Sequence, residues 1–133
     1  MREPACRERS DRELRRALRW ALRKLQLGNW TWELVFDAKA VNHPLLREMG
    51  GVMGRVRIYL AKRHFVAGIL RQACAGDDVD PVYTVMHESV HVMLDCVSSL
   101  ADPDDKLHEL FEQVVESVAL VLHELWRAER EDE

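Results

Sequence analysis

The sequence has few of the features that mark secreted, membrane-bound or disulfide-stabilised proteins. Its three cysteines, Cys6, Cys74 and Cys96, are odd in number and form no Cys-x-x-Cys pair, so we expect neither a disulfide framework nor a cysteine zinc cluster. The first ten residues, MREPACRERS, lack the apolar run of a secretory signal. No stretch approaches the ~18 consecutive apolar residues of a membrane span. These absences predict a cytoplasmic protein with reduced thiols and no membrane partner.

Other functional signatures are missing as well. The chain shows no internal repeat and no low-complexity linker, and no serine or cysteine lies in the sequence context typical of a nucleophilic enzyme. The stretch GGVMG, from Gly50 to Gly54, lacks the lysine and the spacing of a phosphate-binding P-loop. We expect GGVMG to form a flexible turn that borders a cleft.

The composition is that of a globular protein. The chain has 133 residues, of which 47% are hydrophobic and 32% charged, which fits a single domain over residues 1–133. A chain of this length buries roughly two thirds of its unfolded surface. We expect residues 1–10 to be flexible and residues 129–133 to be a frayed acidic tail.

The net charge of −4 hides a strong asymmetry between the two ends. Residues 1–27 hold nine Lys and Arg against four Asp and Glu, whereas residues 77–133 hold three against sixteen. A basic segment can bind nucleic acid or an acidic partner. Because Glu8, Asp11 and Glu13 interrupt this one, we interpret it as a solvated helix face and do not expect nucleic acid as a partner.

The first half of the chain predicts one helix followed by strands. An S-x-x-E capping box at Ser10 and Glu13 starts a helix from Asp11 to Leu27, and Gly28 is its expected stop. Alternating apolar residues predict strands over residues 30–41 (WTWELVFDAKAV) and 55–61 (RVRIYLA). Residues 64–76 (HFVAGILRQACAG) are ambiguous, and we interpret them as a short helix that ends at Gly76.

Two Asp-Pro pairs predict the starts of two further helices. Asp80 caps a helix that begins with Pro81 and reaches about Val97, and Asp102 caps one that begins with Pro103 and reaches about Arg127. The order helix, strand, strand and three helices predicts an α+β fold. In it, helices pack against a small antiparallel or mixed sheet.

The first of these two helices carries HESVH, with His87, Glu88 and His91. Residues four apart lie one above the other on a helix, so the two imidazoles can bind one Zn²⁺. Glu88 can then act as general base on a water molecule bound there. The alternative is structural: surface water or acids of the neighbouring helix satisfy the two histidines.

A catalytic zinc site needs a third protein ligand. No histidine follows at the short HExxHxxGxxH spacing, because that position is Val97. The candidates are Glu109, Glu112 and Glu116 on the next helix. This helix also has a wide apolar face and carries Val115, Ala119 and Leu120 around its acids, so part of the acidic side is expected to be covered. A covered carboxylate needs a partner, and zinc would be one.

HExxH followed about twenty residues later by a glutamate on a second helix resembles the gluzincin pattern of zinc metallopeptidases. This resemblance implies a zincin-like fold, a Zn²⁺ cofactor and a peptide or protein substrate. It implies Glu112 as the third ligand and Glu116, four residues on, as the acid that orients His87. The reverse assignment of Glu112 and Glu116 stays open, with Glu109 as a third choice.

Residues 30–125 also resemble small single-domain metallopeptidases of bacteria and their phages, although only HESVH is specific. In such a minimal gluzincin, the strand over residues 55–61 would pair with an extended substrate. Larger gluzincins stabilise the oxyanion with a His or Tyr from a further domain, whereas we expect the single domain over residues 1–133 to supply such a residue itself. The candidates here are Tyr59, His64, Tyr83 and His108. Two other functions remain possible: a zinc-bearing or metal-free interaction module, and a purely structural zinc site.

The remaining aromatic, histidine and sulfur side chains have structural interpretations. We interpret His108 and His123 as helix-surface residues, although His123 is also a candidate neighbour of the site. We expect Cys96 to be a buried thiol. The expected core residues are Trp20, Trp30, Trp32, Trp126, Met86 and Met93.

Overall fold

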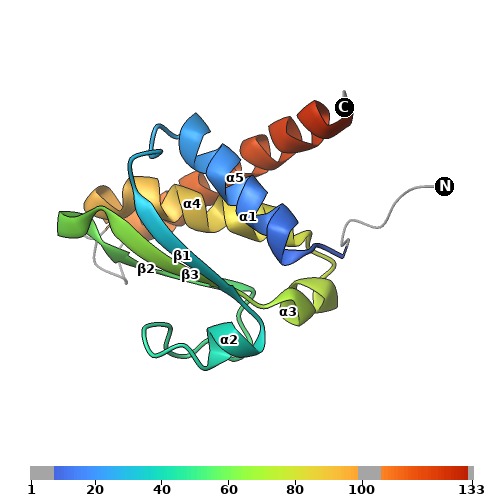
Figure 1. Cartoon of the computed structure of the whole chain (residues 1–133). Coiled ribbons are helices and arrows are strands. Elements are labelled where there is room, and N and C mark those ends of the chain that lie inside the picture. The colour runs from blue at the N-terminus through green and yellow to red at the C-terminus, as the bar shows by residue number, and fades with distance from the viewer. Residues whose placement is uncertain (1–7, 99–105, 132–133) are drawn as a thin grey trace.

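A mixed three-stranded sheet lies between a layer of helices and a smaller layer formed by one long connection (Figure 1). The computed structural model of the chain describes residues 8–98 and 106–131. Its elements in chain order are α1 (Asp11–Lys24), β1 (Thr31–Phe36), α2 (Ala38–Val41), β2 (Gly54–Tyr59), η1 (Leu60–Lys62), β3 (His64–Ile69), α3 (Arg71–Gly76), α4 (Pro81–Ser98) and α5 (Lys106–Glu131). The predicted α+β class is therefore confirmed.

Helix α1 starts as the capping box predicts but ends earlier than expected. The Glu13 N–H donates to Ser10 Oγ at 3.1 Å. At the other end, the Leu27 N–H donates to the Leu22 carbonyl at 2.7 Å, and Gln26 adopts a left-handed conformation with φ 60°. This hydrogen-bond pattern closes the helix at Lys24. Gly28 is thus not the stop, because Gln26 takes the left-handed position two residues before it.

The sheet has one more strand than the sequence predicts. Its order is β1-β3-β2, with β3 parallel to β1 and antiparallel to β2. The prediction of a helix over residues 64–76 is wrong for its first half, because residues 64–69 form the central strand. Its second half, α3, does end at Gly76.

Gly68, near the middle of residues 64–76, has a packing role in β3. A Cβ atom at this position would lie 2.7 Å from Leu46 Cδ1 and 3.0 Å from Ala40 Cβ. The glycine therefore lets the connection between β1 and β2 lie directly on the sheet. The residues buried there are Ala40, Leu46, Met49 and Val66.

The two other predicted strands are both shorter than expected. β1 ends at Phe36 rather than Val41, because Asp37 has φ 56° and the chain then enters α2. β2 ends at Tyr59 rather than Ala61, and η1 follows.

The main core lies between the sheet and helices α1, α4 and α5. Alternate strand residues face it, as the two-residue period of a strand requires. The largest side chains that are fully buried there are Leu14, Leu18, Phe65, Ile69, Val82, Val85, Met86, Val90 and Trp126. Trp20 of α1 packs edge-on against Trp126 of α5, with ring centroids 5.7 Å apart, so both tryptophans are core residues as predicted. None of the described helices is long and apolar enough to cross a membrane.

The start of α4 is held by a buried carboxylate. Asp80 caps the helix by accepting from the Val82 N–H at 3.0 Å. It also accepts from Arg9 at 3.0 and 2.7 Å, and its Oδ2 lies 2.9 Å from His123 Nε2. Burial alone would raise the pKa of Asp80, but the hydrogen bonds from His123, Arg9 and Val82 outweigh it and hold the pKa well below its usual range. Asp80 thereby joins α4 to α5 and to the residues before α1.

Both chain segments that were expected to be loose contain ordered residues. Of residues 1–10, Arg9 pairs with Asp80 and Ser10 caps α1. At the other end, α5 continues to Glu131, and Glu129 accepts a hydrogen bond from Trp20 Nε1 at 2.6 Å. The expected helix start at Asp102 lies outside the described residues, as does the side chain of Cys96.

Replacing Asp80 by Asn keeps a capping side chain but removes the charge that pairs with Arg9. We expect the free energy of unfolding to fall by about 3 kcal/mol at neutral pH, because the buried ion pair with Arg9 is lost and the guanidinium keeps only Glu13 as a counterion. The folded-state pKa of Asp80 is depressed, so its contribution is complete above the unfolded pKa of about 3.9 and is lost as the pH falls below it. In urea unfolding, the difference in stability between the two proteins should therefore be constant above about pH 4 and shrink steadily as the pH is lowered further.

Asp77→Asn is the matched control, because Asp77 is exposed. It should change the free energy of unfolding by less than about 0.5 kcal/mol. An Asp80→Asn protein as stable as wild type at pH 7, or a difference that does not depend on pH, would contradict the role of Asp80.

Candidate metal centre

Helix α4 presents its two motif histidines at the margin of the core. Val82, Val85, Met86 and Val90 are fully buried on its inner side. His87 and His91 lie one turn apart on another side, with about a quarter of each side chain exposed and ring centroids 4.9 Å apart. The two histidines thus share a face of α4 that is separate from its most apolar side.

Helix α5 brings a carboxylate to this face. Val115, Ala119, Leu122 and Trp126 are its buried residues, so this side packs against α4 and α1 (Figure 1). Glu112 lies at the edge of the packed side, about one turn before Val115. Its Oε1 is 3.7 Å from His91 Nε2.

His87, His91 and Glu112 form a group that fits a metal ion. One ligand atom from each lies within 4.8 Å of the others. In a tetrahedral zinc site with bonds of about 2.0–2.1 Å, ligand atoms are roughly 3.4 Å apart, so small side-chain movements would close the group on an ion. Two imidazoles and a carboxylate are a donor set typical of catalytic zinc.

The other two candidate acids lie differently. Both are exposed, but Glu116 lines the cleft beside Tyr83 and His87, whereas Glu109 does not. Neither belongs to the group of ligand atoms found among the described residues. The geometry therefore favours Glu112 over Glu116 as third ligand. The support of His87 by Glu116 stays a prediction.

The electrostatics around His87 favour a cation. Glu88, whose Oε1 lies 3.6 Å from His87 Nδ1, raises the pKa of His87, and burial lowers it. The charges of Glu88, Glu112 and Glu116 raise it further, so the net shift is upward. The same negative surroundings would stabilise a bound divalent ion.

Glu88 lies deeper than the histidines, with only 7% of the residue exposed. It sits beneath the first residue of β2: a Cβ atom at Gly54 would lie 3.1 Å from Glu88 Oε1 and 2.6 Å from Thr84 Cγ2. Any larger residue at position 54 would displace these side chains. Gly54 thus makes room for the carboxylate, and the sequence alone gave no sign of this pairing.

A cleft of about 310 Å³ opens over this carboxylate. It is lined by Met53, Gly54, Tyr83, Thr84, His87, Glu88 and Glu116. The end of the glycine-rich stretch GGVMG borders the cleft, as expected. The cleft gives a small molecule or an extended chain access to Glu88 and His87.

Of the four oxyanion candidates, Tyr83 lines the cleft. Its ring centroid is 6.3 Å from that of His87, and burial together with the charge of Glu116 raises its pKa. Tyr59 and His64 pair at the far end of the β2–β3 hairpin from Gly54. His108 lies on α5, one turn before Glu112.

The interpretation of His123 as a surface residue is wrong. Its side chain is only 13% exposed, it contacts Asp80, and its ring lies edge-on to Tyr83 at 5.9 Å. His123 therefore connects the buried carboxylate at the start of α4 with a residue of the cleft. The sequence offered no local signal for this contact, because Asp80 and His123 are 43 positions apart.

No protein-family model, no curated protein and no solved structure matches this chain.

Metal analysis of the purified protein tests the group directly. We expect one zinc ion per chain, and His87→Ala or His91→Ala should abolish it because two ligands cannot retain the ion through purification. Glu112→Gln should lower the zinc content strongly. Glu116→Gln is the matched control, the same change one turn along the same helix, and should keep the zinc. Loss in Glu116→Gln with retention in Glu112→Gln would assign the third ligand to Glu116 instead.

Proposed function

We propose that the chain is a zinc-dependent peptidase with a zincin-like fold of minimal gluzincin type. His87, His91 and Glu112 hold Zn²⁺, and Glu88 is the catalytic residue. The observation that carries this proposal is the convergence of three ligand atoms within 4.8 Å beside a buried glutamate that lines a cleft. The sequence motif required two of these ligands to be close, but the third comes from a helix that lies beyond residue 105.

The proposed chemistry divides between the metal and the side chains. Bound Zn²⁺ would polarise the scissile carbonyl and lower the pKa of a water molecule toward ~7. Glu88 accepts a proton from the water whose oxygen attacks the carbonyl carbon. It then delivers this proton to the leaving amine as the C–N bond breaks. The burial of Glu88 beneath Gly54 keeps its carboxylate oriented toward the cleft.

Tyr83 is the residue that we propose for the oxyanion. Its raised pKa keeps the phenol protonated at neutral pH, so it can donate a hydrogen bond. Because Tyr83 lies on α4, one turn before His87, a single helix would supply the oxyanion donor, the general base and two ligands. This arrangement would remove the need for the further domain that larger gluzincins use.

The open edge of β2 is the proposed docking site for a peptide substrate. β2 pairs with β3 on one side. The Leu70 N–H donates to the Met53 carbonyl at 2.8 Å. From this pair onward, residues of β2 that hydrogen-bond to β3 alternate with residues whose backbone groups point away from it. The N–H and C=O groups of Gly54, Val56 and Ile58 therefore point toward the open edge. A peptide strand paired there would run past Gly54 into the cleft.

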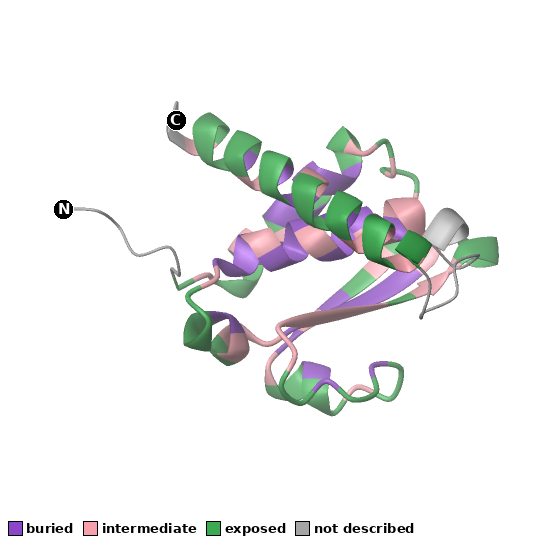
Figure 2. Ribbon diagram, turned by 180° about the vertical axis from the view of Figure 1, so that it is seen from behind, coloured by how far each residue is buried: buried purple, intermediate pink, exposed green. Residues whose placement is uncertain are grey.

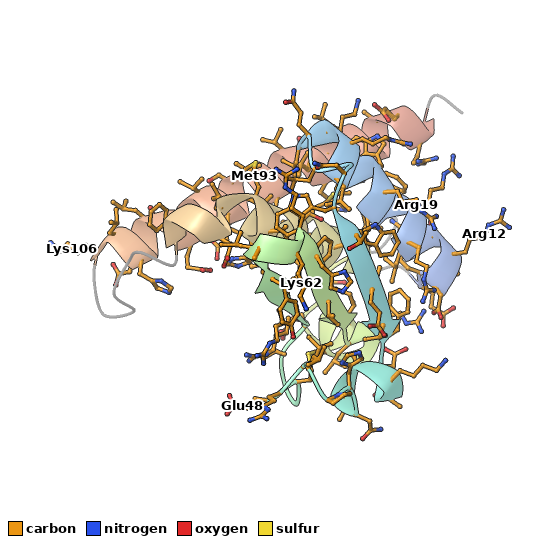
Figure 3. The ribbon with its side chains drawn as sticks, turned by 60° about the vertical axis from the view of Figure 1, so that its left-hand side comes forward. Arg12, Arg19, Glu48, Lys62, Met93 and Lys106 are labelled. Atoms are coloured by element: carbon orange, nitrogen blue, oxygen red, sulfur yellow. The ribbon has the colours of Figure 1, made fainter. Side chains whose placement is uncertain are left out.

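The alternative is a zinc-bearing or inactive interaction module on the same fold. The observation that favours it is a row of exposed apolar side chains on α5, which offers a surface for another protein. The basic face of α1 is a weaker indication, although Arg12 does project from α1 into solvent (Figure 3). The experiment on Glu88 distinguishes the two functions.

Glu88→Gln should keep the zinc and lose hydrolysis by about 10²- to 10⁴-fold, because a neutral amide cannot take the proton. The measurement is cleavage of a fluorogenic peptide library by the zinc-loaded protein, with metal content determined in parallel. Tyr83→Phe should lower kcat by at least about 10-fold with the zinc retained.

Glu109→Gln, an exposed carboxylate on α5, is the control and should cleave at the wild-type rate. If Glu88→Gln cleaves peptides as fast as the wild-type protein, the proposed mechanism is wrong. A zinc-loaded wild-type protein that cleaves no member of the library would favour the interaction module.

Substitutions in β2 test the docking edge. Val56→Pro removes an N–H that points away from β3, so the fold should persist while kcat/KM falls at least about 10-fold. Val56→Ala controls for the lost side chain, and its kcat/KM should stay within about three-fold of the wild-type value. Arg57→Pro removes an N–H inside the ladder and should destabilise the sheet. Equal cleavage by Val56→Pro and Val56→Ala would place the substrate elsewhere.

A further inference from the structure

Helix α5 carries most of the large apolar side chains that are exposed among the described residues. Nine large apolar side chains are exposed among them, and six belong to α5. These six are Leu107, Leu110, Val114, Leu120, Val121 and Leu125, each 45% to 58% exposed. The sequence showed a wide apolar face on this helix, but the structure covers only part of it. Figure 2 shows α5 along the surface of the molecule, with most of its outward side exposed.

Most of these residues form a continuous ridge. Five of the six follow one side of the helix at spacings of three and four once Ser117 and Ala128 are included. We define the ridge as Leu107, Leu110, Val114, Ser117, Val121, Leu125 and Ala128. It contains no charged residue. At about 100° per residue, Glu112 and Glu116 lie on the far side of α5 from the ridge. The ridge spans 22 residues, about three heptads, a length at which such a pattern indicates helix pairing.

The order of side chains along the ridge is nearly the same from both ends. Leu110, Val114 and Ser117 on one half correspond to Leu125, Val121 and Val118 on the other, about a centre between Ser117 and Val118. Val118 is half-buried beside the ridge. A two-fold interface requires this self-complementarity, because each residue must match its counterpart in the other copy.

We infer that a second copy of this chain covers the ridge, with the two α5 helices antiparallel. Leu110 would then face Leu125 of the second copy, and Val114 would face Val121. Leu107 would lie against the small Ala128. The sequences of residues 1–7 (MREPACR) and 99–105 (SLADPDD) hold too few apolar side chains to match a ridge of this length.

Charge at the ends of the ridge favours the antiparallel arrangement. Lys106 is exposed at the first turn of α5, far from the C-terminal end (Figure 3), and Glu124 is exposed beside the ridge near the other end. Antiparallel pairing places Glu124 of the second copy on the same flank as Lys106, about 7.5 Å away along the axis and within reach of the long lysine side chain, and it aligns the helix dipoles favourably. Parallel pairing would instead place Lys106 beside Lys106 and Glu124 beside Glu124.

Pairing along the ridge leaves the candidate metal centre open. Glu112, the residue of α5 in the candidate metal centre, lies on the opposite side of the helix from the ridge. Dimer formation and zinc binding should therefore be independent of each other. A variant that loses one property should keep the other.

Light scattering and sedimentation equilibrium of the full chain test the assembly. We expect a mass of twice 15.5 kDa at micromolar concentration. Val114→Glu with Val121→Glu should weaken the dimer by at least about 30-fold while circular dichroism and zinc content stay unchanged. Leu60→Glu, the same type of change at an exposed apolar residue outside α5, should remain dimeric. A wild-type chain that stays monomeric, or a double variant that dimerises like wild type, would overturn the inference.

Engineered cysteines test the direction of the helices. In the antiparallel pair, two copies of residue 117 are offset by only about 2 Å along the axis, whereas two copies of residue 107 are about 31 Å apart. Under mild oxidation, Ser117→Cys should link two chains and Leu107→Cys should not, because a disulfide spans about 6 Å between Cα atoms. Peptide mapping separates these links from those of Cys6, Cys74 and Cys96. Equal linking by both variants would contradict the antiparallel arrangement.

Discussion

The buried carboxylate of Asp80 is the interaction on which the arrangement of the helices depends. It caps α4, receives two hydrogen bonds from Arg9 ahead of α1, and contacts His123 of α5. An unpaired charge at this depth would cost several kcal/mol, so these partners stabilise the carboxylate in its buried position. Through these contacts, one side chain joins three segments that are far apart in the sequence. The contacts help to fix the angle between α4 and α5 and the position of α5 along α4.

The candidate metal centre depends on that position of α5. α4 contributes the two histidines and the buried Glu88, while α5 contributes the acid beside His91. The position of Glu112 along α4 is set by contacts several turns away, chiefly the packing of Trp126 on Trp20 and the contact of His123 with Asp80. The sheet adds the remaining constraint, because Gly54 at the start of β2 leaves room for Glu88.

Helix α5 has three sides with different roles. Val115, Ala119, Leu122 and Trp126 form its packed side, and Glu112 and Glu116 lie along the margin that faces α4 and the cleft. The third side is the apolar ridge, which no described part of the chain covers. Separating the acids from the ridge around the helix allows one element to serve a charged site and an apolar surface without placing carboxylates in an apolar contact.

Local signals were sufficient for the parts of the fold that depend on neighbouring residues. Ser10 and Asp80 start helices where the sequence predicts, because a capping side chain binds a backbone N–H only two or three residues away. The shared face of His87 and His91 follows from helical geometry alone. The strand over residues 64–69 was missed because it is buried on both faces and so lacks alternation, and because Gly68 serves a contact with Leu46.

The sequence by itself determined that two histidines and a glutamate share one helix and that acids follow on the next. Only the tertiary structure decided which acid lies beside His91, that His123 belongs to a buried pair, and which side of α5 stays exposed. The physical reason is that Glu112 and Glu116 lie one turn apart on the same side of α5. Local periodicity cannot separate them, whereas the position of α5 along α4 can, and contacts between residues up to about a hundred positions apart determine it.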